Sequence, residues 1–122
     1  MIEEARIRRP DLSWHHGDLE HMDFGTFDAI VSAGNVIPFI DPATYPLVAA
    51  NLRRHLTEHG IVVTGFGLAE EHLPPGALLV DFAAYQRAFE EAGFVLSERF
   101  GGWDRGDPSD QYSVSVFRRA TD

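Results

Sequence analysis

The segment from Phe27 to Phe39 constrains the fold of this chain most, because it reads as a buried strand that runs into small residues and then an amide. Residues 27–33 are largely apolar on both faces, the pattern of a strand that is covered on both sides in a parallel sheet. Ligands of open α/β sheets bind at the carboxyl ends of such strands. The segment therefore predicts a central strand of a doubly wound α/β domain. The expected ligand crevice lies at Ser32, Ala33, Gly34 and Asn35.

A second strand end is predicted upstream. Residues 12–16 read as a short strand, Gly17 and Asp18 form its exit turn, and Leu19 follows. This arrangement puts a carboxylate beside a ligand at a strand's carboxyl end. The glycine-rich strand-to-helix turn that normally comes first in a nucleotide-binding α/β domain does not precede it.

Composition narrows the classes of function. The 122 residues and 44% hydrophobic content predict a single domain over residues 1–122. A net charge of −9 argues against nucleic acid and membrane surfaces, so a small-molecule substrate is the expected partner. All ten bases are Arg and there is no Cys, which excludes lysine Schiff bases, thiolate nucleophiles and cysteine metal sites in this chain. No apolar run approaches a bilayer span and the acidic start is unlike a signal peptide, so a cytoplasmic location is expected.

The remaining elements follow from periodicity and from helix end signals. Pro10 should end a first helix, Gly60 a second and Gly93 a third, and Asp81 should cap the third. The last two strands alternate and are joined by a turn, which favours an antiparallel hairpin. The predicted helices span residues 1–9, 46–56 and 81–92, and the predicted later strands span residues 61–66, 94–100 and 112–117.

This order and these motifs resemble the class I S-adenosylmethionine-dependent methyltransferases, after the second strand of their sheet. The segment Trp14-His-His-Gly-Asp-Leu19 resembles the third strand with its adenine-contacting acid. The segment Phe27-Asp-Ala-Ile-Val-Ser-Ala-Gly-Asn35 resembles the fourth strand, and the segment from His59 to Phe66 resembles the fifth. The resemblance implies a partial Rossmann-like three-layer α/β sandwich, with the family's sheet order 3-2-1-4-5-7-6 and a C-terminal antiparallel hairpin.

The resemblance also implies what is missing. The family's first two strands and glycine-rich loop have no counterpart, so an N-terminally truncated domain is expected, with S-adenosyl-L-methionine binding weakened or lost. Strands three and four are not neighbours in the family, which leaves strand edges open. Open edges recruit partners, so we expect a homodimer through the exposed edge or through exchange of the N-terminal segment. Alternatively, the strand at residues 12–16 moves beside the strand at residues 27–33.

The expected cofactor-binding residues are Gly17, Asp18, Leu19, Ser32, Ala33, Gly34 and Asn35. By resemblance, Asp18 accepts a hydrogen bond from the adenine amino group and the Leu19 N–H faces the ring. The structural alternatives are that Asp18 caps the next turn and that Asn35 only completes a strand exit. Trp14 packs near the adenine or, more commonly for a strand tryptophan, in the core.

Six histidines raise the question of a metal site, and none is expected. His15 and His16 would point to opposite faces of a strand, and His55 and His59 straddle a helix end. His21 is a weak candidate for a catalytic base, and its alternative is a surface histidine. Further substrate-side candidates are Tyr45, His72, Trp103 and Tyr112.

The function that the resemblance implies is methyl transfer from S-adenosylmethionine to a small-molecule acceptor, and it leaves open whether this chain is competent alone. The alternative is a non-catalytic α/β assembly or scaffold module. A dehydrogenase fragment fits less well, because Gly17-Asp18 and the terminal hairpin suit the methyltransferase pattern better.

Overall fold

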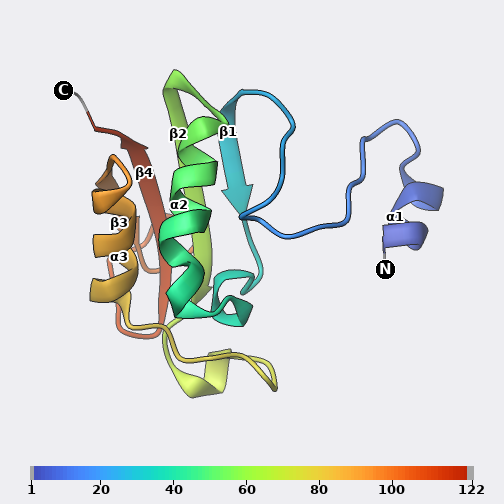
Figure 1. Cartoon of the computed structure of the whole chain (residues 1–122). Coiled ribbons are helices and arrows are strands. Elements are labelled where there is room, and N and C mark those ends of the chain that lie inside the picture. Colours follow the sequence, from blue (N-terminus) through green and yellow to red (C-terminus); the bar gives the residue numbers. More distant parts are fainter. Residues whose placement is uncertain (1, 121–122) are drawn as a thin grey trace.

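A mixed sheet in the order β1-β2-β4-β3 organises residues 2–120, the part of the chain that the computed structural model describes (Figure 1). The strands are β1 (Phe27–Ser32), β2 (Leu56–Gly67), β3 (Phe94–Phe100) and β4 (Tyr112–Arg119). The α-helices are α1 (Ile2–Arg8), α2 (Tyr45–Arg54) and α3 (Phe82–Glu91), and short 3-10 turns occupy Ile37–Phe39, Pro42–Thr44 and Glu70–His72. Within residues 2–120, no helix combines the length and apolar character that a bilayer span needs.

The predicted C-terminal hairpin is confirmed. Strand β4 pairs antiparallel with both β2 and β3, and β1 pairs parallel with β2. Helix α3 forms between residues that the sequence marks: the Asp81 carboxylate accepts a hydrogen bond from the Ala84 N–H, and Gly93 follows the helix at a φ of 100°. A left-handed residue at this position favours glycine, which explains the helix end.

The prediction that the strand at residues 27–33 is central is wrong. Strand β1 is at the edge of the sheet, and most of its residues are exposed, with Val31 at 61%. Although β1 is largely exposed, its sequence is apolar on both faces, as in a strand that is covered on both sides. Within residues 2–120, β1 has a neighbouring strand on one side only, through the register that pairs Ala29 with Ile61 and Ser32 with Thr64.

The prediction of a strand at residues 12–16 is also wrong, and so is the rearrangement that places this strand beside β1. Side-chain contacts with the end of α1 hold the segment instead: Trp14 Nε1 donates to the Arg9 carbonyl at 2.9 Å, and Arg6 Nη2 donates to the Trp14 carbonyl at 3.1 Å. A short apolar run becomes a strand only where a neighbouring backbone completes its hydrogen bonds.

The predicted first helix is confirmed over Ile2–Arg8, and Met1 lies outside the described residues. None of the residues of α1 is buried, and Figure 1 shows the helix apart from the sheet, beyond the outer edge of β1. The i,i+4 pair between Arg8 and Glu4 is exposed, so it contributes little to stability.

Helix α2 ends before Gly60, contrary to the prediction. It ends at Arg54, and β2 starts at Leu56. Gly60 lies inside β2, where a Cβ atom would come within 2.9 Å of Leu56 Cδ2 and 3.1 Å of the Phe27 carbonyl. This glycine therefore permits a close approach of β1 to β2.

The core lies between α2, α3 and one face of the sheet. Tyr85 is its centre, in ring contact with Phe66, Phe89 and Phe117, and its hydroxyl donates to Thr64 Oγ1 at 3.0 Å. On the opposite face, the loop at residues 101–111 brings Trp103 onto the backbone of Gly65, in the space that a Cβ atom would need. Within residues 2–120, helices cover only one face of this sheet (Figure 1).

Candidate functional site

Strand β1 ends on a residue with a buried hydroxyl, just before a tight turn. Ser32, the last residue of β1, has its Oγ atom buried and without a partner among the described residues. Gly34 and Asn35 follow in left-handed conformations, at φ 80° and φ 64°. Buried polar atoms are almost always satisfied, so an orphaned hydroxyl at a strand's carboxyl end is a position where a ligand could bind.

Asn35 has a structural task in this turn. Its Oδ1 accepts a hydrogen bond from the Gly67 N–H at 2.7 Å, and its Nδ2 donates to the His72 carbonyl at 3.2 Å. The side chain thus joins the exit of β1 to the exit of β2. This contact supports the structural alternative that the sequence left open for Asn35, while its predicted role toward a cofactor stays a prediction.

Asp18 lies in an exposed turn, and its carboxylate is accessible. The side chains of Asp18 and His21 are 73% and 76% exposed, and His21 Nδ1 lies 3.7 Å from Asp18 Oδ2. Both residues line a hollow of about 580 Å³ together with Gly17 and Leu19. A carboxylate that faces an open hollow can accept a hydrogen bond from a ligand, and the neighbouring imidazole can accept a proton.

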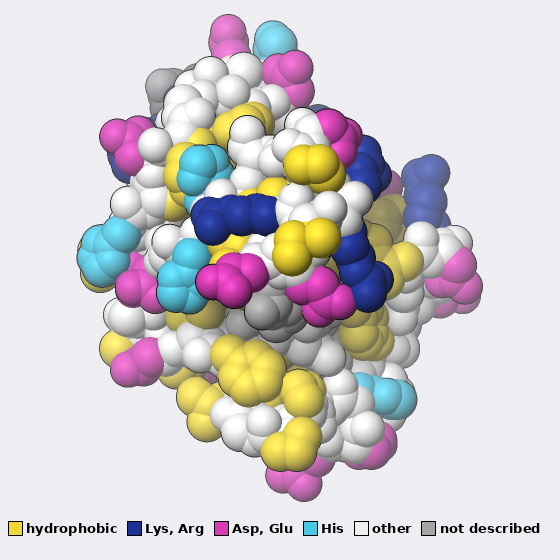
Figure 2. Space-filling view, turned by 90° about the vertical axis from the view of Figure 1, so that its right-hand side faces the viewer, with side chains coloured by type: hydrophobic (Ala, Val, Ile, Leu, Met, Phe, Trp, Pro, Cys, Tyr) yellow, Lys and Arg dark blue, Asp and Glu magenta, His cyan; other side chains and the backbone are white. Residues whose placement is uncertain are grey.

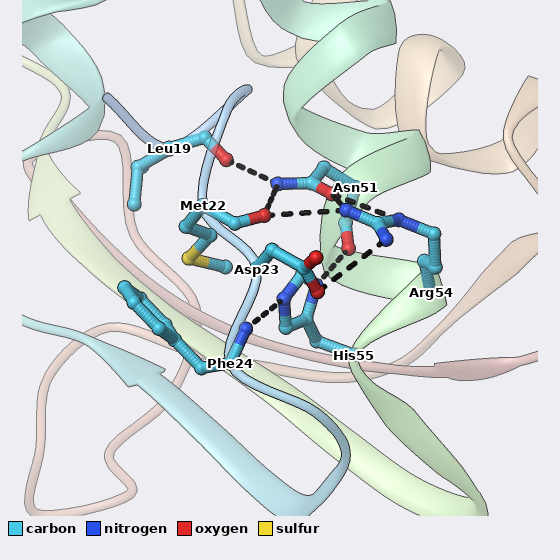
Figure 3. A network of polar contacts seen from close by, with 7 residues as sticks. All are labelled: Leu19, Met22, Asp23, Phe24, Asn51, Arg54 and His55. Carbon is cyan, nitrogen blue, oxygen red and sulfur yellow. Dashed lines mark hydrogen bonds and ion pairs between the residues drawn. The ribbon is translucent and has the colours of Figure 1, made fainter. Parts of the chain in front are cut away.

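The loop that carries this turn is fastened to the last turn of α2 by a polar network that the sequence analysis missed (Figure 3). Asn51 Nδ2 donates to the carbonyls of Leu19 at 2.7 Å and Met22 at 3.0 Å. Arg54 Nη2 also donates to the Met22 carbonyl, at 3.2 Å, and Arg54 Nη1 lies 3.7 Å from Asp23. We call Asn51, Arg54 and His55 the loop clamp.

His55 is the buried member of the loop clamp, with 1% of its surface exposed. Its Nε2 accepts a hydrogen bond from the Phe24 N–H at 3.0 Å, and its Nδ1 lies 2.7 Å from the Asn51 carbonyl. The neutral tautomer with hydrogen on Nδ1 satisfies both contacts. The sequence signals only a basic helix end at these positions, and no local pattern indicates that a loop some thirty residues upstream packs there.

The other histidine candidates and Trp14 lie in different parts of the structure. His15 and His16 are not on a strand; both line the hollow beside Asp18, and the His15 ring stacks on Phe24 at 4.4 Å. His59 lies on β2 and is exposed, whereas His55 is buried. Trp14 is half-buried against α1, so the prediction that it belongs to the core is wrong.

The further substrate-side candidates lie in different environments. Tyr45 is 5% exposed and packs edge-on against Tyr85, and burial, followed by Asp41 and Asp81, raises the pKa of its hydroxyl. Trp103 Nε1 donates to the Tyr112 hydroxyl at 3.2 Å, on the face of the sheet that lacks helices. His72 contacts a predicted site residue, because its carbonyl accepts a hydrogen bond from Asn35 Nδ2.

The predicted site residues form two groups. Gly17, Asp18, Leu19 and His21 line one hollow, and residues 32–35 are not part of its lining. Asp18, Glu20 and His21 could bring ligand atoms to within 4.8 Å of one another, as exposed acidic clusters commonly do, so the absence of a metal stays a prediction.

The fold of this chain is similar to that of solved structures. A TehB-like SAM-dependent methyltransferase from Corynebacterium glutamicum superposes with a TM-score of 0.81 at 30% identity, over 97% of this chain and 62% of that protein. In its fold, this chain matches part of a SAM-dependent methyltransferase structure. The CcbJ methyltransferase from Streptomyces caelestis matches with a TM-score of 0.81 at 13% identity, over 98% of this chain and 71% of that one. The glycopeptide N-methyltransferase MtfA, solved with S-adenosyl-L-methionine, matches with a TM-score of 0.68 at 14% identity, over 86% of this chain and 63% of that one.

The methyltransferase fold accounts for the observed sheet. The predicted counterparts of strands four, five, seven and six are β1, β2, β4 and β3, in that spatial order and with β4 antiparallel, which agrees with the predicted order. The chain spans 62% of the length of the Corynebacterium methyltransferase. No protein-family model and no curated protein sequence matches the chain.

Proposed function

We propose that this chain provides the adenine-side and acceptor-side residues of a S-adenosylmethionine-dependent methyl transfer to a small-molecule acceptor. The Asp18 carboxylate carries this proposal. It is 73% exposed, it lines a hollow of about 580 Å³, and its only ion-pair neighbour within residues 2–120 is the His21 imidazole at 3.7 Å. An accessible acceptor next to the Leu19 N–H suits the amino group and ring nitrogens of an adenine.

The residues of the chain also fit the other end of such a cofactor. The buried Ser32 Oγ lacks a hydrogen-bond partner within the described residues, and a polar ligand group could satisfy it. Asn35 keeps one N–H beyond its contacts with Gly67 and His72. In this proposal Asp18 and Leu19 hold the adenine, and Ser32 and Asn35 bind the polar tail.

In such a methyl transfer, the main task of this chain is to position the reactants. A bound sulfonium cofactor supplies an activated methyl group, so alignment of the acceptor and exclusion of water account for much of the rate. His21, beside Asp18, is the residue that could accept a proton from the acceptor. The loop clamp fixes the loop that carries both side chains.

The alternative is that the chain is a scaffold module without catalytic activity. One observation favours it: Asn35 uses its side chain to join β1 to β2, as a purely structural residue does. A scaffold needs the fold and its exposed surfaces, and it does not need an accessible Asp18.

Titration calorimetry with S-adenosylhomocysteine separates the two proposals. We expect heat of binding, and Asp18→Asn should weaken it about tenfold or more, because a hydrogen bond to a charged group is worth about 1.5–3 kcal/mol. Asp107→Asn removes an equal charge from the distant loop at residues 101–111 and serves as the matched control. No heat at millimolar ligand, with the fold intact by circular dichroism, would favour the scaffold.

A further inference from the structure

Three arginines meet in a hollow at the end of the sheet opposite to Ser32. The hollow has a volume of about 550 Å³ and is lined by Arg53 from the last turn of α2, by Arg118 and Arg119 from the end of β4, and by His59 from the first half of β2. Strand pairing fixes this placement, because Arg118 is opposite Ile61 whereas Ser32 is opposite Thr64. We call this feature the arginine hollow.

Each guanidinium of the arginine hollow is held by one hydrogen bond to an uncharged acceptor. Arg53 Nε donates to the Gly93 carbonyl at 3.3 Å, Arg118 Nε donates to Ser97 Oγ at 3.2 Å, and Arg119 Nη1 donates to the Leu56 carbonyl at 3.1 Å. These bonds orient the side chains and leave other N–H groups of each fork available.

Among the residues that the structure describes, these arginines differ from several others in having no carboxylate partner. Within residues 2–120, no carboxylate lies within 4.0 Å of Arg53, Arg118 or Arg119, although the chain has 19 acidic residues and 10 arginines. In contrast, Arg8, Arg9, Arg54 and Arg105 each pair with an acid. Of the described residues that line the arginine hollow, one is acidic, Glu58.

Oriented guanidinium groups without a carboxylate partner are suited to an oxyanion. Their planar forks match phosphate oxygens, and such charge-assisted bonds are roughly twice as strong as neutral ones. The C-terminal end of α2 carries partial negative charge, so the attraction must come from the side chains alone.

The net charge of the chain favours a small anion over an extended one as the ligand. At −9, the chain repels an extended polyanion such as nucleic acid, whose charges reach far beyond the hollow. A small anion inside the hollow is screened from distant acids, because the Debye length is about 8 Å at physiological ionic strength. We propose that the arginine hollow binds a small phosphate-bearing anion. This proposal is independent of the proposed methyl-transfer function, whose residues are not part of the lining of the arginine hollow.

Inorganic pyrophosphate is the probe, and titration calorimetry on the whole chain is the measurement. We expect binding that weakens about tenfold in Arg118→Gln and in Arg119→Gln. The matched control is Arg87→Gln, which removes one exposed arginine of α3 outside the hollow and should bind as the unchanged protein does, within about twofold. Circular dichroism of each variant checks the fold.

Two results would overturn the proposal: the unchanged protein does not bind pyrophosphate, or the arginine variants and Arg87→Gln bind it equally.

Discussion

Asn35 and Gly67 join the exits of two neighbouring parallel strands, because the Gly67 N–H donates to Asn35 Oδ1 at 2.7 Å while Asn35 Nδ2 donates to the His72 carbonyl. We expect Asn35→Ala to lower the free energy of unfolding by about 1–3 kcal/mol, since it removes both bonds and leaves a residue with a Cβ atom at φ 64°. Urea denaturation measures the change.

Two other substitutions at the same position separate the causes. Asn35→Gly relieves the left-handed backbone and loses both bonds, so it should cost less than Asn35→Ala. Asn35→Asp keeps the acceptor for the Gly67 N–H and loses the donor, so it should cost least. Equal stability of all three variants would show that the side chain of Asn35 does not connect the strands.

We expect that a substitution in the loop clamp speeds amide exchange locally, over residues 19–24. Asn51→Ala removes the donor to the carbonyls of Leu19 and Met22, so we expect faster amide exchange over this loop, including the Phe24 N–H that bonds His55. Hydrogen exchange with mass spectrometry measures it. Thr44→Val removes one exposed hydrogen bond at the other end of α2 and serves as control. Unchanged exchange in Asn51→Ala would mean that other contacts hold the loop.

We expect the burial of Tyr85 to lower the free energy of unfolding at alkaline pH. Complete burial raises the pKa of its hydroxyl above the ordinary value of 10.0. Below about pH 10 the hydroxyl is protonated in both states and its contribution is fully present. As the pH rises above this value, the unfolded chain ionises and the folded protein does not, so stability falls by about 1.4 kcal/mol per pH unit.

Urea unfolding between pH 8 and 12 tests this expectation. Tyr85→Phe should flatten the decline, although Tyr45, whose pKa burial also raises, keeps part of it. Thr64→Val removes the hydrogen bond from the Tyr85 hydroxyl and keeps the tyrosine, so its decline should remain. The same slope in Tyr85→Phe and in Thr64→Val would contradict the assignment to Tyr85.

We expect the protein to self-associate through the outer edge of β1. Phe24, Phe27 and Val31 are 45%, 44% and 61% exposed, and hydrophobic side chains gather between charged ones on this side of the molecule (Figure 2). We propose that a second copy pairs with this edge, since a twofold axis would place two β1 strands antiparallel and Asp28 is the one charged residue in β1. Light scattering after size exclusion should give a dimer in the micromolar range.

Val31→Lys places a charge at this edge and should shift the protein to monomer. The matched control is Leu47→Lys, at a 60% exposed position on α2, which should leave the dimer intact. A monomer at high micromolar concentration in the unchanged protein would refute the proposal.

Local chemistry made part of the fold predictable. Asp81 and Gly93 mark the ends of α3 because a carboxylate cap and a left-handed glycine act within a few residues. The hairpin from β3 to β4 follows from alternation and a turn. Gly60 misled the prediction of α2, because its small size serves the approach of β1 to β2 and not the end of a helix.

The candidate site was predictable only in its exposed turn. Asp18 follows Gly17 in a pattern that sequence can show, whereas the loop clamp joins Met22 to Asn51 and Phe24 to His55 across some thirty residues. Hydrogen bonds of that span depend on how α2 lies against the loop, which no local pattern encodes.

The sequence by itself determined the helix ends, the alternation of the late strands and the net charge, because propensity, capping and ionisation act over short stretches of chain. The tertiary structure decided that β1 is an edge strand, that residues 12–16 are not a strand and that three arginines face one hollow. The physical reason is that a strand exists only with a hydrogen-bonded neighbour, and that neighbour is set by packing across the whole fold.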